Sequence, residues 1–148
     1  MIAAVLVTFI FFAAGAARGA LSPVRMTEHG STVLVWLYSH PEPGTKRSRA
    51  RVERYFKAKV WYGLRLARVY EPFMCLHSHE GAWDSETGNG YHGGLQFDDG
   101  FQATYGLAFM RLWGNAGHWP PLFQMVAAYR AQRVRGYAPW GTRELCGL

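Results

Sequence analysis

The chain has 148 residues, a length that allows one domain with a short extension and excludes a large multidomain protein. Aromatic residues make up 16% of it, which suits a small core or a groove that stacks on sugar rings. The formal net charge of +6 favours an anionic partner, and nucleic acid, acidic lipid and an anionic cell wall all meet that condition.

The first segment, residues 1–17, is apolar and ends in small residues. Its apolar run covers residues 2–14, which is the length of a signal-peptide core and short for a bilayer span. Ala14-Gly15-Ala16 offers a cleavage site, although no Lys or Arg precedes the run. The sequence therefore predicts a cleaved signal peptide and a secreted, extracellular protein, with an uncleaved N-terminal membrane anchor as the alternative.

The two cysteines, Cys75 and Cys146, lie far apart and form no CxxC pair. In a reducing cytosol they would be buried thiols, whereas after export they would close a large disulfide loop. Because the leader predicts export, we expect the disulfide.

Residues 18–48 are expected to form a linker region whose role the sequence does not indicate. Turn-forming residues occur at Ser22-Pro23 and over residues 40–44. An apolar run, residues 32–38, lies between them and is too short to span a membrane. It predicts a short strand or helix that packs on another element.

Residues 46–70 are strongly basic and hold nine of the sixteen Lys and Arg residues. Apolar residues recur among them at helical spacing, which predicts a basic amphipathic helix over residues 49–69. The simplest interpretation is the solvated face of a packed helix, and the alternative is adhesion to an anionic cell-wall or membrane surface. Nucleic acid is not the expected partner, because no DNA- or RNA-binding signature accompanies the charge.

Residues 70–148 predict a compact, mainly helical unit. Pro72 is expected in the first turn of a helix that carries Cys75, His79 and Glu80. The glycine-rich segment 88–97 cannot continue that helix, so a tight turn or hairpin is expected there.

Two further helices are expected after the glycine-rich segment. Asp99 is expected to cap the first, with Gln102 completing a capping box. Pro120-Pro121 opens the second, which is expected to stop at Gly136. A core this small needs a covalent link, and the two cysteines span nearly all of it.

Glu80 is the first candidate for chemistry. It ends an apolar helical segment and precedes Gly81 and Trp83, so it could face a cleft. A partly desolvated carboxyl group near an indole keeps its proton more readily, which suits a general acid.

A metal site is the main alternative, and it would use histidines close to Glu80. Two histidines spaced as His-x-His on a helix point in different directions, and the HExxH pattern is absent, so no metal is expected. Ser78 lacks the GxSxG elbow of a nucleophile. Asp84, Glu86, Asp98 and Asp99 are interpreted as caps or loop residues, which leaves Glu80 without a second carboxylate. The histidines considered are His77, His79, His92 and His118.

The segments 75–83 (CLHSHEGAW) and 87–97 (TGNGYHGGLQF) resemble the catalytic domain of resuscitation-promoting factors, in the transglycosylase-like group of the lysozyme superfamily. Pro139-Trp140 and Cys146 resemble the end of that domain. The resemblance covers about residues 70–148. It departs at one point, since the family's cysteine directly precedes the glutamate, whereas His79 does so here and Cys75 lies one helical turn earlier.

The resemblance implies an α+β, mainly helical fold, namely a reduced lysozyme-like domain with a small glycine-rich hairpin, here preceded by the basic helix. It also implies secretion and cleavage of peptidoglycan between N-acetylmuramic acid and N-acetylglucosamine, with Glu80 as the catalytic residue. The residues implied to bind the glycan strand are Trp83, Thr87, Tyr91 and Gln96.

A single carboxylate favours lytic transglycosylation, in which the substrate's own 6-hydroxyl group attacks and no protein nucleophile is needed. Hydrolysis of the muramidase type is one alternative, and a non-catalytic wall-binding or signalling protein is another. We expect a monomer that binds peptidoglycan and uses no cofactor.

Overall fold

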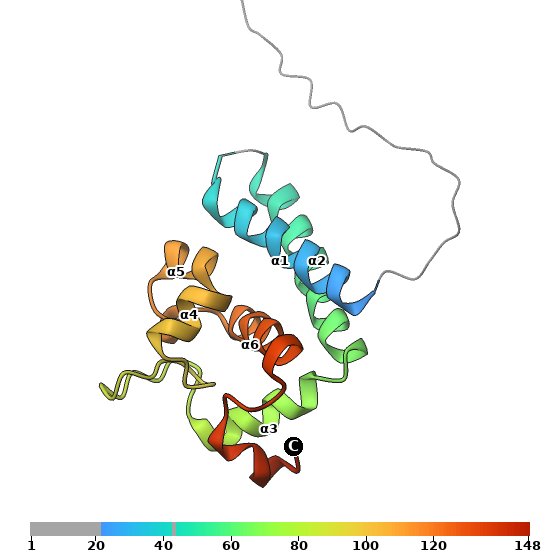
Figure 1. Ribbon diagram of the computed structural model, residues 1–148. Coiled ribbons are helices and arrows are strands. Elements are labelled where there is room, and N and C mark those ends of the chain that lie inside the picture. Colours follow the sequence, from blue (N-terminus) through green and yellow to red (C-terminus); the bar gives the residue numbers. More distant parts are fainter. Residues whose placement is uncertain (1–21, 43) are drawn as a thin grey trace, which may run out of the picture.

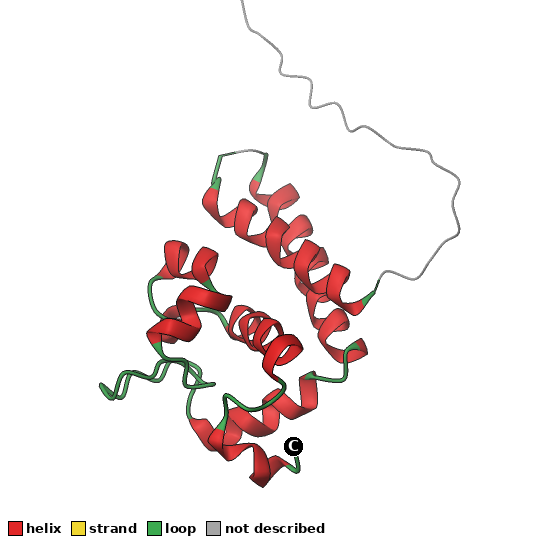
Figure 2. Ribbon diagram, in the orientation of Figure 1, coloured by secondary structure: helices red, strands yellow, loops and turns green. Residues whose placement is uncertain are grey.

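The protein is described here by a computed structural model that covers residues 22–42 and 44–148 (Figure 1). The expected signal peptide, residues 1–17, lies outside the described residues. The expectation of a mainly helical fold is confirmed (Figure 2). In the described part of the chain, the expected β component consists of isolated bridges, Glu86 with His92 and His92 with Phe97. The elements are α1 (Pro23–Ser39), α2 (Lys46–Leu66), α3 (Tyr70–Glu80), α4 (Asp99–Tyr105), α5 (Leu107–Trp113), η1 (Ala116–His118), α6 (Pro121–Arg135) and η2 (Gly141–Cys146).

The helices α1 and α2 form an antiparallel hairpin along one side of the molecule (Figure 1). Small residues bring the two helices close. A Cβ atom on Gly30 would lie 2.6 Å from Val60, and one on Gly63 would lie 2.6 Å from the hydroxyl of Thr27. The region 18–48, expected to be a linker with one short packed element, therefore contains a full helix. The basic helix expected over 49–69 is found as α2.

The hairpin is tied to the rest of the protein by an ion pair. The guanidinium of Arg130, on α6, donates to both carboxylate oxygens of Glu28, on α1, with a shortest distance of 2.7 Å. Arg130 also donates to the carbonyl of Tyr105, at 2.9 Å, and lies over the ring of Phe109. This one side chain therefore joins α1, α4, α5 and α6.

The central helix α6 packs against α1, α2, α3 and α4 and is buried over most of its length. The structure confirms its predicted bounds, because Pro121 is its first residue and Gly136, with φ of +58°, follows its last. Around it lies an aromatic-rich core. The largest fully buried apolar side chains of this core are Trp119, Phe73, Phe97, Phe109, Phe123, Leu34, Leu64, Leu76, Leu95 and Met125.

The predicted cap of α4 is wrong by one residue. Asp98, not Asp99, is the N-cap, and its carboxylate accepts from the backbone N–H of Phe101 at 2.6 Å. Gln102 does not complete a capping box, because its side chain is buried. Its oxygen accepts from the backbone N–H of Ala116 at 2.7 Å, and its nitrogen donates to the carbonyl of Phe97 at 3.1 Å.

Among the described residues, no helix is both long enough and apolar enough to cross a bilayer.

Candidate functional site

A cleft of about 340 Å³ opens where the end of α3, the glycine-rich segment and the C-terminal segment meet. Three of the predicted site residues, Glu80, Tyr91 and Gln96, line it together. A smaller hollow of about 110 Å³ shares Tyr91 and Gln96 with the cleft and ends at Asp98 and Arg135. The cleft lining comprises Glu80, Asn89, Tyr91, Gln96, Pro139, Trp140, Gly141 and Thr142.

Glu80 is the last residue of α3 and is half-buried. The hydroxyl of Thr142, on η2, donates to its Oε1 at 2.5 Å. Among the described residues, no hydrogen bond to Oε2 is found. One carboxylate oxygen is therefore held in place while the other is left for a ligand in the cleft.

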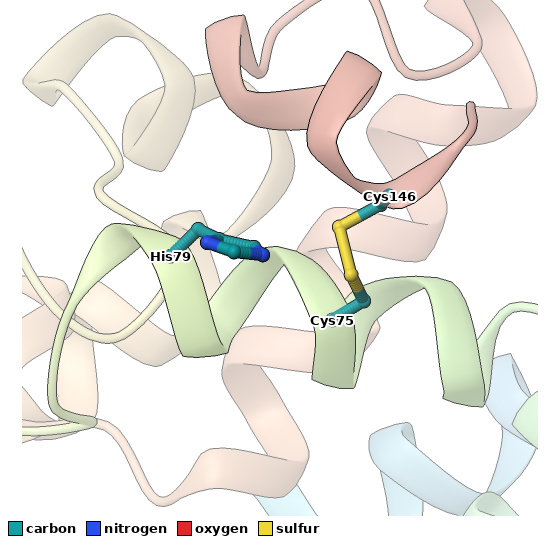
Figure 3. Close-up of side chains that lie close together, drawn as sticks. All are labelled: Cys75, His79 and Cys146. Atoms are coloured by element: carbon teal, nitrogen blue, oxygen red, sulfur yellow. A yellow bond between two sulfur atoms is a disulfide. The ribbon is translucent and has the colours of Figure 1, made fainter.

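The disulfide expected between Cys75 and Cys146 is present, with the two Cα atoms 5.9 Å apart. It joins α3 to η2, so it fixes the helix that carries Glu80 to the segment that carries Thr142 (Figure 3). His79 lies beside it, with a ring nitrogen within 4.8 Å of both sulfur atoms. The sulfurs are bonded to each other, so in this form they do not offer thiolates to a metal.

The other histidines do not gather around Glu80. His77 stacks on Trp83 with ring centroids 3.8 Å apart, and its Nδ1 lies 3.1 Å from the carbonyl oxygen of Gly94. His92 pairs with Glu86 at 2.8 Å. His77 and His92 therefore bond to different parts of the structure and do not share a site with Glu80.

The two adjacent glycines of the glycine-rich segment are required by close packing. A Cβ atom on Gly93 would lie 2.5 Å from Gln124, and Gly93 also has φ of +74°. A Cβ atom on Gly94 would lie 2.6 Å from the ring of His77. Any larger residue would therefore push this segment away from α3 and α6 and displace the floor of the cleft.

Gln96 adopts φ of +49°, a left-handed conformation that is uncommon outside glycine. It is held there by Gly93, whose carbonyl accepts from the backbone N–H of Gln96 at 3.1 Å and from its side-chain amide at 2.8 Å. The pairing of His92 with Phe97, at 2.9 and 3.0 Å, closes the turn around it. The expected tight turn thus places the Gln96 side chain at the cleft.

The tip of the glycine-rich segment carries Asn89 and Tyr91 to the cleft. The side-chain oxygen of Asn89 accepts from the hydroxyl of Thr87 at 2.5 Å and from the backbone N–H of Tyr91 at 3.0 Å. Thr87 is not among the lining residues, so its contact with the cleft is through Asn89. Trp83 is not among them either, since its ring stacks on His77.

Sequence reasoning missed two residues that hold the cleft together. The amide nitrogen of buried Gln124 lies 2.8–3.0 Å from the carbonyl oxygens of Trp83, Ala116 and Trp119, which share its two N–H donors. Its amide oxygen accepts from the N–H of Gly94 at 2.9 Å. The indole of Trp140 donates to the carbonyl of Leu95 at 3.1 Å. The sequence does contain a signal for Gln124, which is a polar residue within the apolar pattern of a predicted helix.

The site combines one carboxyl group, two amide side chains, a hydroxyl and an exposed tyrosine ring in an open cleft. Such a set can donate a proton and hydrogen-bond a polyhydroxylated ligand. Comparison of the chain with protein-family models, with curated proteins and with solved structures found no match.

Proposed function

We propose that this protein cleaves peptidoglycan between N-acetylmuramic acid and N-acetylglucosamine, with Glu80 as the single general acid and base of a lytic transglycosylation. The observation that carries the proposal is the cleft itself. Of the described residues that line it, Glu80 is the one carboxylate, and Thr142 holds one of its oxygens. The resemblance of segment 87–97 to resuscitation-promoting factors supplies the substrate and the expectation of a reduced lysozyme-like domain.

The cleft offers groups that suit a sugar chain. Tyr91 is 46% exposed, so its ring is available to stack on a sugar face. The amides of Asn89 and Gln96 can each donate and accept hydrogen bonds with hydroxyl and N-acetyl groups. The cleft and the smaller hollow share Tyr91, Gln96, Pro139 and Trp140, so they adjoin, which suits a ligand longer than a single sugar.

In the proposed reaction, the protonated Oε2 of Glu80 gives its proton to the glycosidic oxygen, and the bond from that oxygen to the anomeric carbon breaks. The 6-hydroxyl of the same N-acetylmuramic acid attacks the anomeric carbon. The carboxylate of Glu80 then takes the hydroxyl proton, so the enzyme returns to its starting state and no water is consumed. The hydrogen bond from Thr142 keeps the carboxyl plane fixed throughout.

Of the described residues that line the cleft and the adjoining hollow, Asp98 is the carboxylate other than Glu80. It lies in the adjoining hollow, and its side chain caps α4 through the N–H of Phe101. A nucleophile or base must instead face the acid across the scissile bond. The capping role of Asp98 therefore supports the mechanism with one carboxylate over hydrolysis.

Peptidoglycan lies outside the cytoplasmic membrane, so the proposal includes export. We accordingly propose a secreted, cell-wall-associated protein, in agreement with the disulfide, since disulfides persist in oxidising compartments.

The test compares Glu80→Gln with Glu144→Gln, an exposed position on η2 that does not line the cleft. Glutamine keeps the size of the side chain and removes the titratable proton. We expect Glu80→Gln to lower the rate of peptidoglycan solubilisation by about 100-fold to 10,000-fold and Glu144→Gln to leave it unchanged. Retention of the full rate in a folded Glu80→Gln protein would contradict the proposal.

A further inference from the structure

The helix α2 carries eight basic side chains and one acidic one, Glu53. The hydrogen bonds from Lys57 and then Tyr38, at 2.6 and 2.7 Å, occupy Glu53 and hold the pKa of its carboxyl group below its usual value. Arg49 is also engaged, since it donates to the backbone carbonyls of Leu37 and His40. Glu53, the only acidic residue of α2, is thus bonded to Lys57 and Tyr38 and forms no salt bridge with the exposed arginines of α2.

Four arginines of α2 are exposed on one face of the helix. Arg47, Arg51 and Arg54 follow one another at spacings of four and three residues, so they share one face of the helix. Arg65 lies five helical turns beyond Arg47 and points the same way. All are exposed, and none has a salt bridge to an acidic residue in the described part of the chain. We call the α2 outer face the exposed residues Lys46, Arg47, Arg51, Arg54, Tyr55, Tyr62, Arg65 and Leu66.

Large apolar side chains lie in the same face. Tyr55, Tyr62 and Leu66 are 62%, 55% and 45% exposed, and their spacing of seven and four residues puts them in one stripe beside the arginines. Exposed tyrosine and leucine side chains beside arginines are typical of a helix that lies in the headgroup region of a bilayer. A purely electrostatic partner would make no use of the exposed leucine and tyrosine rings.

The start of the α2 outer face also contains a hollow of about 310 Å³. It brings two guanidinium groups, two hydroxyls and an apolar side chain together at the N-terminal end of a long helix. A phosphate group beside a short apolar segment, as in a phospholipid headgroup, matches these groups. The hollow is lined by Thr45, Arg47, Ser48, Arg51 and Val52.

We propose that the α2 outer face binds the anionic phospholipid headgroups of a membrane leaflet, with α2 lying along the surface. This interaction is separate from the cleft and does not depend on the activity of Glu80. In Figure 1, α6 lies between the α1–α2 hairpin and the glycine-rich segment. Adhesion through α2 would therefore place the glycine-rich segment on the side of α6 that is opposite to the hairpin.

The test uses the full chain and vesicles of phosphatidylcholine with or without 30% phosphatidylglycerol. The test variant combines Arg51→Gln with Arg54→Gln on α2. The control variant combines Arg111→Gln with Arg133→Gln and removes the same charge from exposed sites on α5 and α6. We expect the α2 pair to weaken partitioning to anionic vesicles by about 30-fold and the control pair by less than about threefold. The apolar leader is common to both variants, so its contribution cancels.

A second comparison separates a lipid surface from a soluble polyanion. We expect Tyr55→Ser with Tyr62→Ser to weaken binding to anionic vesicles by about tenfold or more and to leave binding to inorganic polyphosphate unchanged. Equal partitioning to neutral and anionic vesicles would overturn the proposal. The proposal would also be overturned if the tyrosine substitutions left vesicle binding unchanged and polyphosphate competed fully with the vesicles. The partner would then be a soluble polyanion.

Discussion

The region around the cleft and the α1–α2 hairpin use their polar side chains differently. Around the cleft, bonds join residues far apart in sequence, such as Cys75 with Cys146 and Glu80 with Thr142. In the hairpin, several polar side chains bond within their own helix, as Thr32 does with the carbonyl of Glu28. The first arrangement fixes a geometry, as an acid catalyst requires. In the second, Arg47, Arg51 and Arg54 form no salt bridge with any described residue and lie exposed on the α2 outer face.

The two regions also differ in the bonds that hold their parts together. The cleft region is linked to itself by a disulfide and by the four hydrogen bonds of Gln124. The hairpin is linked to it by apolar packing and by the pair of Glu28 with Arg130. Changes in the cleft region should therefore cost stability and activity together, and changes in the hairpin should cost less of either.

The largest expected effect on stability is that of the disulfide. The loop it closes spans 71 residues, so replacing Cys75 and Cys146 with serine should lower the free energy of unfolding by about 4 kcal/mol. Urea denaturation measures this difference. Dithiothreitol should destabilise the wild-type protein to the same extent and leave the serine variant unaffected; equal sensitivity of both proteins would contradict the prediction.

Gln124 comes next. Replacing it with methionine keeps the volume but leaves the N–H of Gly94 and the carbonyls of Trp83 and Trp119 without their partner, which should cost about 3 kcal/mol. The carbonyl of Ala116 keeps its hydrogen bond from the N–H of Trp119. Gln132→Met, on the same helix, is the control, and its effect should stay below about 0.5 kcal/mol. Similar losses in the two variants would show that the network around Gln124 adds nothing to the cleft region.

Thr142 should affect the rate more than the stability. Thr142→Val removes the hydrogen bond to Glu80 at nearly constant volume, so the peptidoglycan solubilisation rate should fall by about tenfold, equivalent to about 1.4 kcal/mol. Thr104→Val on α4 provides the matched control, because its hydroxyl bonds only to the carbonyl of Gly100. An unchanged rate in Thr142→Val would mean that Glu80 needs no positioning from η2.

The smallest effect is expected at the hairpin. Glu28→Gln weakens the link to Arg130, which is part-exposed, and should lower stability by about 1 kcal/mol. Hydrogen exchange should quicken in α1 and α2 while α3 and α6 keep their protection. Glu71→Gln, at an exposed position on α3, should change neither; faster exchange throughout the molecule would contradict a separately attached hairpin.

The sequence predicted those helices that begin at a proline or end before a glycine. Pro121 and Gly136 delimit α6 as expected. The first half of α1 was not predicted as helix, because it packs through Thr27, Gly30 and Ser31, while the large buried residues Leu34 and Leu37 lie only in its second half. Close approach of two helices through small side chains leaves no hydrophobic periodicity to detect.

The candidate site was predictable only in part, for a related reason. Glu80, Tyr91 and Gln96 belong to segments with a recognisable pattern, and the structure brings them to one cleft. Thr142 is 62 residues from Glu80 and belongs to no motif, so only the folded chain reveals their contact. The cap of α4 was misplaced because Gln102 is drawn into the core by Ala116, a contact that spacing cannot indicate.

The most direct test of the central claim is the chemical nature of the products. Purified peptidoglycan is digested with the wild-type protein and with Glu80→Gln, and the soluble fragments are identified by mass spectrometry. If Glu80 acts alone as proposed, the wild-type fragments end in 1,6-anhydro-N-acetylmuramic acid, and the variant releases almost none. Fragments that end only in reducing N-acetylmuramic acid, or equal release by the variant, would contradict the account.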